Sequence, residues 1–292
     1  MAQPFRIGVM QLTMEPLDVM LESARTMDEA GMDTIWLAEA YPWWRKHGME
    51  ARSSTGVAAL MGRATDRLTI GWGIIAATTR HPVQAAMDAR VVQEAAGPGR
   101  FILGFGTSKI FLNNTKTQTR KTLGPMRDAV TIVRGVLSGE RFDYDGDTWS
   151  ADVPALAADA HSPREVPPVY VAATAPKMQA LAGEIAGMYL ANKVQNIQGA
   201  ADTLLDLAGL EQDEIRPVAE AMEEGGRLAA KAKVTDAILD KCKPIAGTPS
   251  DCIAAIEEYK DAGCTHVMLE LWGEDRLEQI RLFGDQVLPH VR

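Results

Sequence analysis

The chain has 292 residues, a formal net charge of −9 and a sequence pI of about 5.1, with 46% hydrophobic and 24% charged residues. This balance is typical of a globular protein, and the acidic charge argues against a nucleic-acid or anionic-membrane binder, which usually carries a basic face. The length fits one β/α barrel, which takes ~250 residues. We therefore expect a single domain over residues 1–292.

Cysteine content and hydropathy point to a reduced, aqueous compartment. Cys242, Cys252 and Cys264 are odd in number and lack a C-x-x-C spacing, so we expect neither a disulfide framework nor a metal site. No apolar run approaches the ~20 residues of a membrane span. The first residues lack the basic segment and apolar stretch of a signal peptide. We expect a cytoplasmic protein with no nucleic-acid or membrane partner.

The first hundred residues alternate continuous apolar runs with helical patterns. Helical spacing and caps predict helices from Leu17 to about Met27, from Ser53 or Ser54 to about Ala64, and from Gln84 to Ala96. This β-α-β alternation is the pattern of a parallel sheet with crossover helices. Continuous apolar strands indicate that both faces of the sheet are covered. The predicted strands are Phe5–Met10, Thr34–Ala38, Leu68–Ile75 and Phe101–Phe105.

An insertion is predicted after the fourth strand, over about residues 109–166. It begins with a polar, unpatterned stretch, Lys109–Leu123, which we expect to be a long loop. A helical stripe follows from Met126 to Leu137 and ends at Gly139. Asp145-Gly146 then predicts a hairpin within Phe142–Trp149.

The remainder adds three strands, at Pro168–Ala173, Gly187–Ala191 and Thr265–Leu271. An atypical segment over about residues 199–243 contains only predicted helices, at about 200–207, 213–223 and 235–241. The total is seven strands where a complete (β/α)₈ barrel has eight. We therefore predict an α/β fold of the TIM (β/α)₈ type, shortened around strand 7. Either a seven-stranded barrel closes, or residues assigned to helix fill the gap.

Polar and aromatic residues follow the predicted strands, at the end where a β/α barrel places its active site. Glu39 follows the second strand and can orient a ligand or act as an acid or base; the alternative is a helix-capping or salt-bridged surface carboxylate. Trp43 and Trp44 can wall a flat ligand or simply pack in the loop. The turn Thr78–His81 suits an anion, although Arg80 can instead pair with a neighbouring helix and His81 can support the loop.

The exits of strands four and five offer small residues and hydrogen-bond donors. Gly104 and Gly106 lack the G-x-G-x-x-G spacing, so we expect them to let a planar ring or the next loop approach the backbone. Thr174, Ala175 and Lys177 can hold an anionic group, whereas Thr248 and its neighbours are expected only to cap a helix. No nucleophilic triad, metal motif or P-loop is present in the sequence. These features favour a bound redox cofactor that carries the chemistry.

Five blocks of sequence, in order, resemble the bacterial-luciferase-like superfamily. Within it, the resemblance is greatest to the coenzyme F420-dependent oxidoreductase branch, which includes methylenetetrahydromethanopterin reductase and F420-dependent glucose-6-phosphate dehydrogenase. The blocks are GIIAATTRHP, GPGRFILGFGTSKIFLNN, PMRDAVTIVRGVLSGERFDYDGDTWS, PPVYVAATAPKMQALAGEIAG and IAGTPSDCIAAIEEYKDAGCTHVML.

The resemblance implies a TIM-barrel oxidoreductase that transfers a hydride between coenzyme F420, a deazaflavin, and a small organic substrate. FMN is the alternative cofactor, as in the flavin-dependent monooxygenases of the superfamily. A different class of protein, a non-catalytic binding protein derived from the same superfamily, is kept open by the shortened strand-7 region. Relatives are commonly dimers, so the resemblance also implies a homodimer.

The resemblance further implies roles for individual residues. It places a bulge with a non-prolyl cis peptide at Gly73 and Ile74, behind the cofactor ring. It makes Glu39 the catalytic carboxylate and puts Trp43 and Trp44 beside the ring as substrate-binding residues. The implied cofactor-binding residues are Gly73, Ile74, Thr107, Ser108, Lys109, Asn113, Ala173, Thr174 and Ala175.

Two positions depart from the relatives. Family members commonly carry His directly after the strand-two carboxylate, where this chain has Ala40. The glucose-6-phosphate dehydrogenases carry Glu after strand four, where this chain has Lys109. Together these departures argue against sugar-phosphate oxidation by the acid–base route of those relatives, and they favour a reductase or a different substrate.

Overall fold

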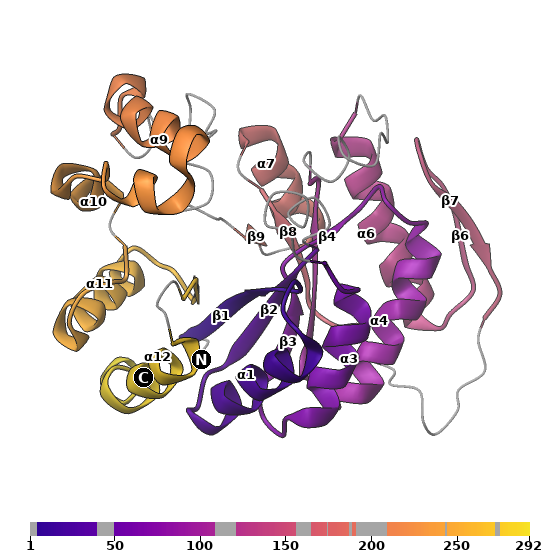
Figure 1. The fold of residues 1–292 in the computed structure, drawn as a ribbon. Helices are drawn as coiled ribbons and strands as arrows, with labels where there is room; N and C mark the ends of the chain where they lie inside the picture. Colours follow the sequence, from indigo (N-terminus) through magenta and orange to yellow (C-terminus); the bar gives the residue numbers. More distant parts are fainter. Residues whose placement is uncertain are drawn as a thin grey trace. The chain divides into compact units, whose positions relative to one another are not determined.

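The structure is a computed structural model, and it describes residues 5–39, 50–108, 121–155, 165–173, 175–186, 189–190, 209–242, 244–271 and 275–292. The chain forms two compact units, residues 1–190 with 263–292 and residues 191–262 (Figure 1). The organisation as a single domain stays a prediction. None of the described helices is both long and apolar enough to cross a membrane.

A parallel sheet forms the centre of the first unit. Its strands run in the order β10-β1-β2-β3-β5-β8-β9, with β4 paired to β5, and each pair of neighbours in this order is parallel. In the described part of the chain no pairing joins β9 to β10. The predicted parallel α/β sheet is therefore confirmed. The strands are β1 (Arg6–Leu12), β2 (Thr34–Ala38), β3 (Thr69–Trp72), β4 (Ile75–Ala76), β5 (Phe101–Gly106), β8 (Val169–Ala172), β9 (Tyr189–Leu190) and β10 (His266–Leu269).

Helices alternate with these strands, as the sequence predicts, and Figure 1 shows α1, α3, α4 and α6 following one another alongside the sheet. Ser53 caps α3 by accepting a hydrogen bond from the Gly56 amide, and Gly139 ends α6 in the left-handed conformation, with φ of 74°. The helices of this unit are α1 (Leu17–Glu29), α3 (Ser54–Ala64), α4 (Pro82–Ala96), α6 (Leu123–Ser138), α7 (Pro176–Ile185), α12 (Arg276–Gln286) and α13 (Leu288–Val291).

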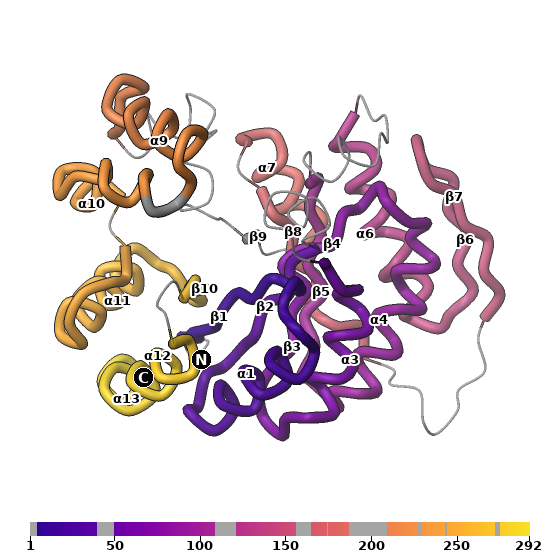
Figure 2. The backbone as a smooth tube through the Cα atoms, in the orientation of Figure 1, coloured from indigo at the N-terminus to yellow at the C-terminus, as the bar shows by residue number. Residues whose placement is uncertain are grey.

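The predicted hairpin in the insertion is confirmed as β6 (Phe142–Asp145) and β7 (Ser150–Val153), which pair antiparallel. Figure 2 shows it beside α6. The buried carboxylate of Asp128 in α6 holds its turn: it accepts hydrogen bonds from the amides of Thr148 (2.7 Å) and Trp149 (3.1 Å) and from the Tyr144 hydroxyl (2.9 Å). The hairpin is thus packed on the helical layer and adds no strand to the central sheet.

The two faces of the sheet carry different side chains because successive residues of a strand point to opposite sides. One face, called the inner face below, carries a cluster of Met10, Trp36, Ile102 and Tyr170. On the other side of β3, Trp72 packs edge-to-face against Phe101, with 5.0 Å between ring centroids. Both sides are fully buried, as expected for parallel strands covered on both faces.

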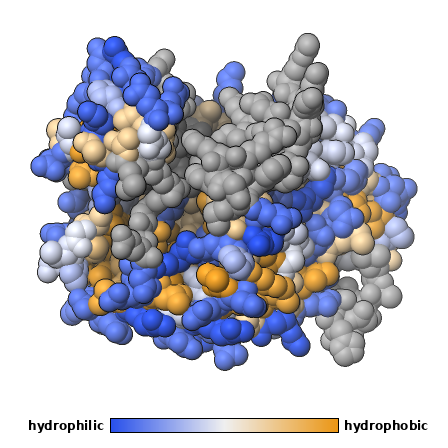
Figure 3. Space-filling view, in the orientation of Figure 1, coloured by the Kyte–Doolittle hydropathy of each residue, from blue (hydrophilic) through white to orange (hydrophobic). Residues whose placement is uncertain are grey.

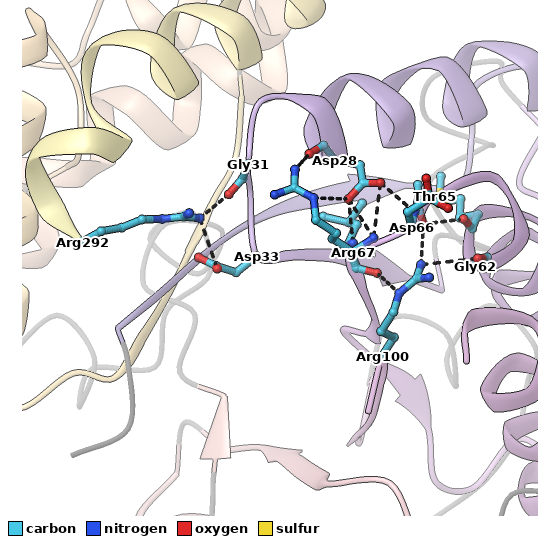
Figure 4. Close-up of polar contacts among 11 residues, drawn as sticks. Asp28, Gly31, Asp33, Gly62, Thr65, Asp66, Arg67, Arg100 and Arg292 are labelled. Atoms are coloured by element: carbon cyan, nitrogen blue, oxygen red, sulfur yellow. Dashed lines mark hydrogen bonds and ion pairs between the residues drawn. The ribbon is translucent and has the colours of Figure 1, made fainter. Parts of the chain in front are cut away.

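A polar network ties the amino-terminal ends of the strands together (Figure 4). The half-exposed turn before β3 donates three amides to the Asp28 carboxylate, from Asp66 (2.7 Å), Arg67 (3.1 Å) and Leu68 (2.8 Å). Beside it, the Arg100 guanidinium donates to Thr65 Oγ1 at 2.7 Å. This end of a β/α fold normally serves stability while the opposite end serves chemistry. We therefore assign the network to stability.

The second unit is helical, with α9 (Gln212–Lys231), α10 (Asp236–Cys242) and α11 (Pro249–Asp261). The absence of a strand is confirmed for residues 209–242, whereas the helix predicted at 200–207 lies outside the described residues. The helix predicted over about 213–223 is confirmed: α9 breaks at Gly226, whose φ of 68° is not helical, and a second helical stretch follows to Lys231. The predicted capping role of Thr248 is confirmed by a reciprocal capping box with Asp251.

Candidate functional site

Small residues line the carboxyl-terminal edge of the sheet. Because all described strand pairs of the central sheet are parallel, the carboxyl ends of its strands share this edge. Ala76 pairs with Gly106, Ala38 pairs with Leu12, and Ala172 pairs with Leu190. Ala38 and Ala172 are half-buried. Ligands of β/α folds bind at this edge, and small side chains leave space there for a bulky group.

A bulge interrupts this edge between β3 and β4, where the peptide Gly73–Ile74 is cis. The Gly73 amide donates to Leu37 O at 2.8 Å, and the Glu39 amide donates to Ile74 O at 3.1 Å. The predicted bulge and cis peptide are confirmed. The prediction of one uninterrupted strand over Leu68–Ile75 is wrong, because the pairing of β3 stops at Trp72 and resumes on β5 only at Ile75.

Glu39 is anchored to this bulge and is mostly buried, with 10% of its side chain exposed. One carboxylate oxygen accepts a hydrogen bond from the Ala76 amide at 3.1 Å, and the other pairs with the Arg80 guanidinium. Arg80 also donates to Asp88 of α4 at 3.1 Å. Glu39 is therefore salt-bridged, as the alternative interpretation proposed, but the pair lies inside the site and not on an open surface. Its catalytic role stays a prediction.

The turn after β4 supports the loop. His81 caps α4, accepting a hydrogen bond from the Val83 amide at 3.2 Å, and its ring packs edge-to-face on Trp149 at 5.1 Å. Thr79 donates from its hydroxyl to Ala76 O at 3.0 Å. The interpretation of Arg80 and His81 as structural supports is thus confirmed. Thr78 differs, because its buried hydroxyl oxygen has no partner among the described residues.

The exit of β5 contains half-buried Thr107 and Ser108. Ser108 has φ of 41°, a left-handed conformation that is uncommon for residues other than glycine and that clusters at functional sites. A side chain on Gly106 would come within 2.7 Å of the Ile74 side chain, so the group that approaches the Gly106 backbone is Ile74 of the bulge. Lys109 and Asn113 lie outside the described residues.

Two predicted cofactor residues follow the end of β8. Ala173 is buried, and Ala175 is exposed at the N-cap of α7. The α7 N-terminus has no side-chain capping hydrogen bond and no acidic residue in its first turn. Thr174, Trp43 and Trp44 lie outside the described residues. The predicted cofactor residues that can be placed therefore lie at the ends of β3, β5 and β8, on one edge of the sheet.

Sequence reasoning missed an aromatic column on the inner face. Trp36 is fully buried between Tyr170 and His266, with centroid separations of 5.5 and 5.4 Å. His266 Nε2 lies 2.7 Å from the Thr34 hydroxyl, and burial, followed by the charge of Arg6, lowers the pKa of His266 to about 4. Alternation within TIWLA, which puts residues 34, 36 and 38 on one face, was the available signal.

A cavity of about 600 Å³ lies apart from the strand ends, between α6, the turn of the β6–β7 hairpin and α7. A bidentate ion pair crosses it from Arg127 to Glu184, with distances of 2.6 and 2.8 Å. Lys177, in the first turn of α7, also lines it. Among the described residues, none at the strand ends of the central sheet lines it, so it is distinct from the site around the bulge.

A parallel β/α sheet with a bulged third strand, small residues at its carboxyl edge and a carboxylate anchored there defines an enzyme fold of the TIM-barrel class. The sequence profile of the family described as "Luciferase-like monooxygenase" matches residues 1–222. The chain therefore belongs to the luciferase-like monooxygenase family.

Individual relatives share about a quarter of the sequence. The chain is 24% identical to an F420-dependent glucose-6-phosphate dehydrogenase of Nakamurella multipartita, covering 91% of this chain and 90% of the relative. It is also 24% identical to a 5,10-methylenetetrahydromethanopterin reductase of Archaeoglobus fulgidus, covering 91% and 92%. The solved coenzyme F420-dependent tetrahydromethanopterin reductase of Methanopyrus kandleri is similar in fold, with a TM-score of 0.82, 21% identity and coverage of 99% and 100%.

Proposed function

We propose that the protein is an oxidoreductase that transfers a hydride between coenzyme F420 and a small organic substrate. The observation that carries the proposal is the Gly73–Ile74 bulge, which opens on the carboxyl edge of the sheet beside the anchored carboxylate of Glu39. Relatives with F420 in their names cover about nine-tenths of the chain and support the same assignment.

The residues at this edge fit a planar cofactor that carries a phosphate. Ala38, Gly73 and Ala172 are half-buried and small, so they leave room for a ring. Thr78 has a buried hydroxyl oxygen without a partner among the described residues, and a ligand can satisfy it. The uncapped N-terminus of α7, at the exit of β8, suits an anionic group. When bound, a deazaflavin or flavin supplies the hydride transfer.

In this proposal the side chains and backbone of the protein bind the cofactor and orient the reacting groups. Arg80 and the Ala76 amide fix the Glu39 carboxylate, so that it can orient the reacting groups without a change of rotamer. We propose Glu39 as the catalytic residue, and Trp43 and Trp44 as substrate-binding residues. The proposed cofactor-binding residues are Gly73, Ile74, Thr107, Ser108, Lys109, Asn113, Ala173, Thr174 and Ala175.

The substrate proposed here is not a sugar phosphate. Ala40 and Lys109 stand where the sugar-phosphate dehydrogenases of the family carry acid–base residues, as the sequence comparison above argues. A reductase acting on another small organic molecule fits these departures better.

Two alternatives remain testable. An FMN-dependent monooxygenase would use the same ring site and phosphate donors. A non-catalytic binding protein is kept open by one observation, the absence of a strand from residues 209–242. Turnover of F420 or reduced FMN with any member of a substrate panel would remove the non-catalytic alternative.

Fluorescence titration separates the cofactors. Purified protein is titrated against F420 and, separately, against FMN, and quenching of each cofactor is recorded. We expect saturable F420 binding at about micromolar concentrations and weaker FMN binding. Tighter binding of FMN than of F420 would favour the FMN-dependent monooxygenase alternative. If the fluorescence of neither cofactor is quenched well above micromolar concentrations, the proposal is refuted.

We also propose a homodimer formed through an apolar face of α3 and α4. Leu60, Met87 and Val91 are 46, 58 and 55% exposed on these neighbouring helices, and Met87 and Val91 lie one turn apart. Figure 3 shows exposed apolar surface among hydrophilic residues on this side of the molecule. A Met87→Glu variant should shift the mass in light scattering from dimer to monomer; an unchanged dimer would place the interface elsewhere. The cytoplasmic location stays a prediction.

A further inference from the structure

We propose that Trp36 is a positioning residue that supports the Gly73–Ile74 bulge from the inner face and thereby sets the depth of the ring site. The consequence for a cofactor rests on the proposed function, whereas the support of the bulge stands on packing alone. Trp36 lies on β2, two residues before the strand ends at Ala38.

The indole of Trp36 lies against glycines of both neighbouring strands. A side chain on Gly71 of β3 would come within 2.5 Å of Trp36 Cε3, and one on Gly8 of β1 would come within 3.0 Å of Trp36 Nε1. A Cβ at Gly73 would lie 3.1 Å from Trp36 Cβ and Cε3. A Cβ at any of these positions would be closer to Trp36 than ordinary packing allows, so the glycines let the indole approach the backbone of both neighbouring strands.

The position of Trp36 is fixed from the other sides. It has no exposed surface, and it packs between the rings of Tyr170 and His266 over a cluster with Met10 and Ile102. The next residue on the same face of β2 is Ala38, which is half-buried. Trp36 is therefore the last bulky side chain of β2 on this face, and the small residues Ala38 and Gly73 lie beyond it toward the strand ends.

Backbone hydrogen bonds hold the edges of the bulge, but Gly73 contributes no side-chain packing to its face. Its backbone is tied to β2 through Gly73 N and Ile74 O, and the following turn is tied to β5 by a 3.0 Å bond from Ala77 N to Gly106 O. Gly73 has no side chain to anchor it in the core. The three nearest heavy atoms that a Cβ there would meet, outside its chain neighbours, all belong to Trp36. The indole thus supplies the packing that Gly73 lacks.

Trp72 offers a matched control. It is also fully buried, it also has an indole nitrogen without a partner among the described residues, and it adjoins the same bulge in sequence. However, it packs on the opposite side of β3, against Phe101. Trp72→Phe should therefore destabilise the fold to a similar extent as Trp36→Phe without altering the inner face.

The test measures amide hydrogen exchange and cofactor affinity in the wild type, Trp36→Phe and Trp72→Phe. Exchange at Gly73, Ala76 and Ala77 is expressed relative to the β1 amide of Val9, which corrects for global stability. We expect this ratio to rise about tenfold in Trp36→Phe and to stay within about twofold of the wild type in Trp72→Phe. Affinity for F420 should fall about tenfold in Trp36→Phe alone.

This experiment distinguishes failure of the positioning role of Trp36 from failure of the proposed function. Equal exchange ratios in the two variants, or a wild-type ratio in Trp36→Phe, would overturn the positioning role. A raised exchange ratio with unchanged affinity would overturn its link to the ring site. If the wild type binds neither F420 nor FMN, the proposed function fails, while the exchange ratios still decide whether Trp36 holds the bulge.

Discussion

Acidification should destabilise this protein through His266. The imidazole is buried on the inner face, with Nε2 2.7 Å from the Thr34 hydroxyl and with Nδ1 buried and unpartnered among the described residues. Removal from water disfavours the charged imidazolium, and the positive charge of Arg6 acts in the same direction. The pKa of His266 is therefore lowered from 6.5 to about 4 in the folded protein.

The sign and size of the effect follow from proton linkage. The unfolded chain binds a proton at His266 near pH 6.5 and the folded chain only near pH 4, so between these values the unfolded state holds more protons. The contribution of His266 to stability is fully present above pH 6.5 and is lost progressively as the pH falls toward 4. At ~1.4 kcal/mol per pH unit, the loss is about 3 kcal/mol.

The assay is urea unfolding of the wild type and His266→Gln at pH 7 and pH 4.5. Glutamine retains a polar group that can reach Thr34 but does not titrate. Between the two pH values we expect the wild type to lose about 2 kcal/mol more unfolding free energy than the variant, because the titration of all other groups is common to both. Exposed His290, replaced by Gln, is the control and should behave as the wild type. Equal pH dependence in wild type and His266→Gln would refute the reasoning.

Three further substitutions test the stabilising contacts and the site. Gly71→Ala should lower the free energy of unfolding in urea by about 2 kcal/mol, because its Cβ would overpack Trp36. Gly183→Ala is the control and should be neutral or stabilising, since a Cβ there meets no atom within 4 Å. Equal effects of the two substitutions would contradict this packing. Asp28→Asn should cost about 2 kcal/mol by the same assay, because three backbone amides lose a charged acceptor, and a wild-type midpoint would exclude that role. Glu39→Gln should lower the steady-state rate constant about 100-fold at saturating cofactor while circular dichroism stays unchanged; full activity would remove Glu39 from the catalytic residues.

Local pattern predicted most elements of the first unit, because each is signalled by residues close in sequence. The Asp145-Gly146 hairpin and the cap at Ser53 depend on neighbours within a few positions. The interruption at Gly73–Ile74 came from the family resemblance, since the continuous apolar run from Leu68 gives no sign of it. The break of α9 at Gly226 agrees with the local signal of a glycine pair, whereas the second helical stretch up to Lys231 was missed.

Contacts within the site were harder to predict because they join distant parts of the chain. Glu39 and Arg80 are 41 positions apart, and Thr34 and His266 are 232 apart. Either pairing becomes evident only when the order and register of the strands are known. Ion pairing of Arg80 with a neighbouring helix was foreseen as an alternative, but its second partner, the Glu39 carboxylate, was not.

The supports of the candidate ring site come mainly from β2 and the residue that follows it. Trp36 contacts the bulge across its face, while the amide and carboxylate of Glu39 hold its edge through Ile74 and Ala76. Rigid elements hold a site more accurately than loops do, and loops vary most among relatives. The insertion and the loops can therefore differ from those of relatives, and change the substrate, without moving the bulge. The departures from the sugar-phosphate dehydrogenases at Ala40 and Lys109 are therefore compatible with the proposed ring site at the bulge.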